Sequence, residues 1–165
     1  MSDMMVPELS GRRVVLKTWR VEDAAWYVEA RDDVIFEFTT ESRDLTVEQA
    51  AEAIARARSS SDLVPFAIWT ADGELVGNLA VSIRARSAEV SYFLAPAGRG
   101  RGYASDAVRT SVAWAMDNLD IDEVVACVAL ANADSTRVLL QAGFIEVGRS
   151  QHNELGETMD YSFRA

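Results

Sequence analysis

A glycine-rich segment past the middle of the chain restricts the fold more than any other part of the sequence. Residues 95–102 hold three glycines and two arginines, between a predicted strand at 89–94 and a strongly helical stretch at 103–119. Glycines allow a tight turn that brings backbone N–H groups close to a ligand. The first amides of the following helix lack partners within it and carry the positive end of its dipole. Such a strand–loop–helix unit is suited to binding a phosphate or pyrophosphate.

The loop alone is compatible with several ligands. A Walker A sequence would need Gly-Lys followed by Ser or Thr, which is absent. A dinucleotide-binding fingerprint would follow the first strand of a βαβ unit, whereas this loop follows a hairpin. A short Arg/Gly tract could contact RNA, and glycines could serve only to form a turn. The local sequence therefore favours phosphate binding and a plain turn equally.

The remaining pattern predicts one mixed α/β domain over residues 1–165. The dipeptide Asp72-Gly73 is typical of a hairpin turn, and Thr46 is a suitable helix N-cap. Strands and helices alternate after that hairpin, which predicts a mixed sheet with helices on both faces. The other predicted strands are 13–18, 65–69, 74–84, 123–130, 144–150 and 157–163, and the other predicted helices are 23–31, 46–58 and 132–142.

Composition excludes several classes of function. The chain has 165 residues and a formal net charge of -10, which disfavours a nucleic-acid partner. No apolar run is long enough to cross a bilayer, and residues 1–10 do not resemble a signal peptide. One cysteine, Cys127, and one histidine, His152, are too few for a zinc site. We expect a cytoplasmic protein without a metal and without a membrane partner.

Several short motifs, taken in order, resemble one family. Arg99-x-x-Gly102-x-Ala104 matches the Q/R-x-x-G-x-G/A signature of the GNAT superfamily of N-acetyltransferases. The downstream pattern Asn132-x-x-Ser135, followed by Gly-Phe at 143–144, resembles the RimJ/RimL-like branch. Residues 12–16, 22–24 and 159–161 resemble that branch's opening and closing segments, so the likeness covers nearly the whole chain.

The resemblance implies a fold and a cosubstrate. The fold is a mostly antiparallel sheet of six to seven strands, with acetyl-CoA held in a cleft between the splayed fourth and fifth strands. A bulge in the fourth strand, which residues 89–94 resemble, would free backbone groups for the pantetheine arm. Arg99 and Arg101 would add mobile positive charge beside the pyrophosphate. The implied cofactor-binding residues are Phe93, Leu94, Arg99, Gly100, Arg101, Gly102, Tyr103, Ala104, Ser105 and Asn132.

The resemblance also implies direct attack of an amine on the thioester, with a base and an acid. Glu89 is the candidate base because its strand borders the cleft, although a solvated strand carboxylate is an equal alternative. Ser135 is the candidate acid, or a donor near the sulfur, and an ordinary polar residue in a first helical turn is an equal alternative. Many relatives carry a tyrosine acid where this chain has Leu139, so the serine-using branch is the better analogue.

The acceptor stays open at the level of the sequence. The resemblance implies a primary amine, either a protein N-terminal α-amine of the ribosomal type or a small-molecule amine. Two alternatives are a non-catalytic acyl-CoA-binding sensor and a phosphate-binding domain for another nucleotide. A homodimer is common among the proteins that the chain resembles.

Overall fold

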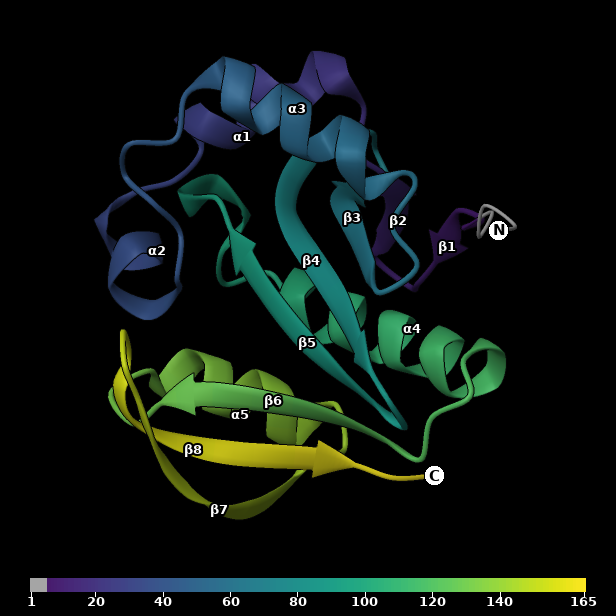
Figure 1. The fold of residues 1–165 in the computed structure, drawn as a ribbon, viewed down its shortest axis with the longest axis vertical. Coiled ribbons are helices and arrows are strands. Elements are labelled where there is room, and N and C mark those ends of the chain that lie inside the picture. The colour runs from purple at the N-terminus through teal and green to yellow at the C-terminus, as the bar shows by residue number, and fades with distance from the viewer. Residues whose placement is uncertain (1–5) are drawn as a thin grey trace.

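One mixed sheet of eight strands forms the centre of the computed structural model, which describes residues 6–165 (Figure 1). The strand order is β1-β2-β3-β4-β5-β6-β8-β7. Every neighbouring pair is antiparallel except β5 and β6, which run parallel. The strands are β1 (Leu9–Ser10), β2 (Val14–Thr18), β3 (Leu63–Thr70), β4 (Leu75–Arg84), β5 (Ser87–Leu94), β6 (Glu123–Ala129), β7 (Ile145–His152) and β8 (Gly156–Phe163).

Helices cover both faces of this sheet, which confirms the predicted mixed α/β architecture. The long helix α4 contacts β2, β4, β5 and β6 on one face, while α3 contacts β3 on the other. The α-helices are α1 (Ala24–Glu29), α2 (Asp33–Phe38), α3 (Val47–Ala57), α4 (Tyr103–Asn118) and α5 (Ala133–Gln141), and two short 3-10 helices are η1 (Val21–Asp23) and η2 (Pro96–Gly98).

Alternation along β3 divides the apolar residues between two cores. Phe66 and Ile68 are fully buried in the larger core, under α4 and α5. Ala67 lies between them in sequence and packs in the smaller core, with Trp19 from the segment before η1 and Ile54 from α3. Successive strand residues point to opposite faces, so a single strand anchors both helical layers.

The sheet opens between β5 and β6. These strands pair over three positions only, from Ser87 opposite Glu123 to Glu89 opposite Val125. Beyond Glu89, β5 continues to Leu94 and β6 continues to Ala129 without pairing to one another. Figure 1 shows the two strands diverging from this end, with α2 beside the open side. The splayed pair of strands that the resemblance implied is therefore present.

Local differences from the predicted elements have physical causes. Residues 33–38 form α2, a helix that the sequence did not predict, because the Asp32 side chain accepts a hydrogen bond from Ile35 N. The expected bulge in β5 is wrong, since β4 and β5 pair without a register shift. The irregularity instead lies between β3 and β4. Gly77 in β4 lets β4 and β5 approach closely, because a Cβ at this position would collide with the Phe93 carbonyl oxygen of β5.

Asp106 connects α4 to the beginning of β2. Its carboxylate, 3% exposed, accepts hydrogen bonds from the backbone nitrogens of Arg12, Arg13 and Val14 at 3.2, 2.7 and 3.1 Å. An anion in the first turn of a helix also interacts favourably with the helix dipole. This one side chain therefore fixes the start of β2 beside the helix that follows the glycine loop.

We expect Asp106→Asn to lower the free energy of unfolding by about 1–3 kcal/mol, because an amide nitrogen would face donors that need an acceptor. Urea denaturation at neutral pH measures this loss. Asp117→Asn is the matched control, since Asp117 is exposed on the same helix. Equal stabilities of the two variants would contradict this role of Asp106.

Candidate functional site

A cleft of about 1050 Å³ follows the opening between β5 and β6. Its walls come from α2 and the loop after it, from β5 and β6, from the start of α4, from α5, and from the β7–β8 hairpin. A smaller pocket of about 330 Å³ adjoins it and shares Gly100, Gly102, Ser105 and Gln141. All the predicted site residues line the large cleft except Arg101, which lines the smaller pocket.

The glycine loop presents unpaired backbone donors to this cleft. In the part of the chain that the structure describes, none of the N–H groups of residues 100–105 donates a hydrogen bond to the protein. Gly100 and Gly102 have φ values of 75° and 80°, and Gly102 is the N-cap of α4. Side chains disfavour such φ values, so glycine makes this turn possible. The result is a row of donors at the positive end of a 16-residue helix.

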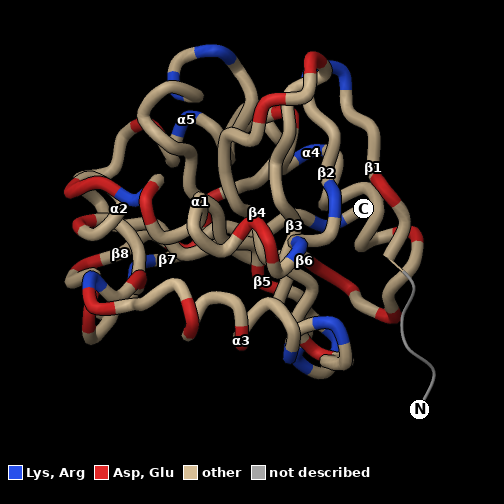
Figure 2. Tube along the Cα trace, turned by 90° about the horizontal axis from the view of Figure 1, so that it is seen from above, with Lys and Arg blue, Asp and Glu red and all other residues tan. Residues whose placement is uncertain are grey.

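Arginines surround the loop although the chain as a whole is acidic. Arg13, Arg101 and Arg109 all line the smaller pocket. Arg13 Nη1 donates to the Arg101 carbonyl oxygen at 3.2 Å, which places this arginine, immediately before β2, beside the loop. Acidic and basic positions are otherwise mixed along the chain (Figure 2). The sequence did not reveal Arg13 as a neighbour of this loop, because it precedes β2, far from the loop in sequence. Arg109 is on α4, about two turns beyond the loop.

Arg99 differs from its predicted role as mobile charge. Its guanidinium forms two hydrogen bonds with the Asp32 carboxylate, each 2.8 Å long. These bonds lower the pKa of Asp32 to about 2, so the pair is ionised at neutral pH. The Arg99 side chain therefore ties the loop to the N-cap of α2 and is not free at the rim.

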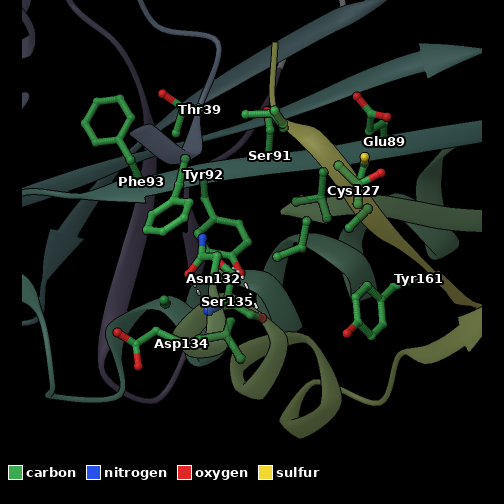
Figure 3. A pocket seen from close by; sticks show the side chains of 18 of the residues that line it. Thr39, Glu89, Ser91, Tyr92, Phe93, Cys127, Asn132, Asp134, Ser135 and Tyr161 are labelled. Carbon is green, nitrogen blue, oxygen red and sulfur yellow. Dashed lines mark hydrogen bonds between the residues drawn. The ribbon is translucent and has the colours of Figure 1, made fainter. Parts of the chain in front are cut away.

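Glu89 lies on the face of β5 that is turned away from α4. It is exposed, lines the cleft, and occupies the last paired position of β5 with β6. Cys127, two residues beyond its partner Val125, lies beside it (Figure 3). Cys127 is partly exposed here, and desolvation by partial burial raises the pKa of its thiol.

Ser135 lies across the cleft, in the first turn of α5. Asn132 is the N-cap of this helix, and its side-chain oxygen accepts a hydrogen bond from Ser135 N at 3.2 Å. Tyr92 of β5 reaches Ser135, with its hydroxyl oxygen 3.1 Å from Ser135 Oγ (Figure 3). Leu139 is fully buried in the core, so the position used for a tyrosine acid in many relatives does not reach the cleft.

Two structural findings bear on other kinds of site. Among residues 6–165, no three His, Cys, Asp or Glu side chains are arranged to hold a metal ion. In the same range, no helix combines the length and the apolar character needed to span a membrane.

Solved structures of similar shape support the fold. RimJ of Mycobacterium smegmatis, solved in complex with CoA-disulfide, superposes with a TM-score of 0.85 over 96% of this chain and 88% of that chain, at 21% identity. Spermidine N-acetyltransferase of Vibrio cholerae, in complex with CoA and spermine, gives a TM-score of 0.82 over 92% of this chain and 95% of that chain, at 16% identity.

Sequence comparisons identify the family. A protein of Bacillus subtilis (strain 168) named "Putative ribosomal N-acetyltransferase YdaF" is 32% identical over 66 residues, which are 40% of this chain and 36% of that protein. The chain thus aligns with only about a third of that relative's length. The model of the Acetyltransferase (GNAT) domain matches residues 13–145, from the residue before β2 to the first residue of β7. Because this match covers most of the chain and includes the glycine loop, the splayed strands β5 and β6, and α5, the protein belongs to the GNAT acetyltransferase family.

Proposed function

We propose that this protein transfers an acetyl group from acetyl-CoA to a primary amine. The observation that carries the proposal is the row of unpaired N–H groups at residues 100–105, which opens into a cleft between splayed strands. Family membership supports acetyl transfer as the chemistry. Acetyl-CoA as donor and the single thiol, Cys127, both suit the cytoplasm, where we place the reaction.

The residues of the cleft fit acetyl-CoA as cosubstrate. The amides of Gly100 to Ser105 would hold the diphosphate, and Arg101 would add positive charge beside it. The unpaired edge of β5 at Phe93 and Leu94 would hydrogen-bond the pantetheine arm, as an added strand would. Within residues 6–165 the side-chain nitrogen of Asn132, Nδ2, has no protein partner, so it can donate to the same arm.

Side chains on the two sides of the cleft would divide the chemistry. Glu89 would accept a proton from the acceptor ammonium, directly or through water, since only the neutral amine can attack. A backbone N–H at Phe93 or Leu94 would stabilise the negative charge that develops on the thioester oxygen. Ser135 would donate a hydrogen bond to the departing sulfur. Positioning and electrostatics would supply most of the rate enhancement.

Carboxylates outnumber arginines among the side chains that line the cleft, which favours a cationic acceptor. Glu41, Glu89 and Asp160 all line it. The two arginines of the cleft wall, Arg99 and Arg137, are already paired with carboxylates. This charge suits an ammonium group, either of a small-molecule amine or of a protein N-terminus such as that of a ribosomal protein.

A non-catalytic acyl-CoA-binding module is the second candidate, because Leu139 leaves no tyrosine acid in its usual place. Release of CoA thiol from acetyl-CoA, assayed with a panel of small amines and N-terminal peptides, separates the two. Amine-dependent release supports the transferase. Tight binding without release across the whole panel supports the module.

Gly102→Trp is expected to abolish CoA binding, since the indole would occupy the diphosphate site at a position that also disfavours side chains. Titration calorimetry measures the affinity, and thermal unfolding shows whether the variant folds. Gly73→Trp is the matched control, because Gly73 also has a positive φ, of 93°, and has open space around it in the β3–β4 turn. Wild-type affinity in a folded Gly102→Trp variant would contradict the site.

Glu89→Gln is expected to lower kcat roughly a hundredfold, with little change in the KM for acetyl-CoA, if Glu89 is the base. The pH–rate profile of the variant should also differ from that of the wild-type protein. Glu157→Gln, an exposed carboxylate on β8, serves as the control. An unaltered rate and pH profile in Glu89→Gln would remove Glu89 from this role.

A further inference from the structure

Ser135 is held by two different residues, one at its backbone and one at its side chain. Asn132 fixes the backbone through the helix cap, as described above. The Tyr92 hydroxyl lies 3.1 Å from Ser135 Oγ and 3.5 Å from the Ser135 carbonyl oxygen. A carbonyl oxygen can only accept, and a phenol is a better donor than an aliphatic hydroxyl, so Tyr92 is the donor.

This arrangement leaves the Ser135 proton available. Among residues 6–165, Tyr92 is the only hydrogen-bond partner of Ser135 Oγ. A serine hydroxyl has one proton to donate and two lone pairs to accept with. Because Tyr92 occupies one lone pair, and Ser135 lines the cleft, the hydroxyl proton can point into the cleft. A hydroxyl that accepts a hydrogen bond also becomes a stronger donor.

We propose that Tyr92 is a positioning residue, which orients the Ser135 hydroxyl as a hydrogen-bond donor to the sulfur of CoA. This inference rests on the proposed function. In the transfer step the amine nitrogen forms the new C–N bond, and the C–S bond breaks with its electron pair left on sulfur. The ammonium proton passes to Glu89 and then to water, and a second proton of the acceptor nitrogen passes to water as the amide forms. Ser135 keeps its proton and stabilises the thiolate, which later takes a proton from water.

Hydrogen bonding suits Ser135 better than proton transfer. An aliphatic hydroxyl is a far weaker acid than a thiol, whose pKa is ordinarily about 8.5, so transfer from Ser135 to the thiolate would run uphill. Tyr92 cannot easily restore such a proton either. Burial raises the pKa of Tyr92 to about 12, which keeps its phenol neutral and able to donate at physiological pH.

Titration of the CoA thiol bound to the protein tests this inference without any acceptor amine. The thiolate absorbs in the ultraviolet, so its absorbance against pH gives the pKa of the bound thiol. We expect that pKa to lie below the value for free CoA. In Tyr92→Phe the acid dissociation constant should fall roughly three- to tenfold, as expected for one lost hydrogen bond, with CoA affinity at low pH little changed.

A double-mutant cycle shows whether Tyr92 acts through Ser135. Ser135→Ala should raise the pKa of the bound thiol at least as much as Tyr92→Phe does. The double variant should raise this pKa no further than Ser135→Ala alone. Ser135→Thr retains a hydroxyl and should stay near the wild-type value. Tyr161→Phe is the matched control, because the Tyr161 hydroxyl makes a similar bond, 3.3 Å long, to Thr136 Oγ1 on the same helix.

With an acceptor amine, kcat should rank the variants in the same order as the thiol titration does. Tyr92→Phe should lower kcat roughly three- to tenfold and leave the KM for acetyl-CoA within about twofold of the wild-type value. Additive effects of Tyr92→Phe and Ser135→Ala, or an equal effect of Tyr161→Phe, would overturn the inference. If the thiol shift and its coupling appear but no amine is acetylated, the transferase proposal fails and the inference about Ser135 stands. Failure of the wild-type protein to bind CoA would overturn both.

Discussion

The early end of pairing between β5 and β6 is the constraint on which the site depends. Two parallel strands in one sheet would normally satisfy each other's backbone groups along their length. Here they pair over three positions and then separate, while both strands continue. The separation leaves one edge of β5 unpaired inside the molecule and creates the cleft below it. A ligand that offers amide groups along this edge would complete the sheet.

The glycine loop places a charged site at one end of that opening. The loop joins β5 to α4, so the strand that borders the cleft leads directly to the helix N-terminus that faces it. Asp106 holds β2 against the same helix, and Arg13 at the beginning of that segment lies against the loop. The ion pair of Asp32 with Arg99 joins the loop to α2 on the other wall. Direct contacts thus join the glycine loop, where we propose that CoA binds, to α2 on the other wall of the cleft.

Local signals in the sequence predicted most of the fold. Asp72-Gly73 formed the expected hairpin turn, and Thr46 formed the expected cap, reinforced by Gln49. These features depend on residues close in sequence, where turn and cap chemistry decide the structure. Helix α2 was missed because it has only six residues and depends on one capping side chain, Asp32.

The candidate site was predictable as a set of segments but not as a set of contacts. The motifs indicated residues 99–105, Asn132, Glu89 and Ser135, and the structure brings all of them to two adjoining pockets. The partners of those residues depend on tertiary packing. Asp32 and Arg99 are 67 positions apart, and Tyr92 and Ser135 are 43 apart, so no local pattern reveals either pair.

The most direct measurement is the change in backbone amide NMR signals when CoA is added to the uniformly ¹⁵N-labelled protein. The account predicts that the largest shifts fall on residues 100–105, with smaller shifts at Phe93 and Leu94 along the open edge of β5. A CoA complex in which these amides do not move, or in which the largest shifts lie outside the cleft, would contradict it.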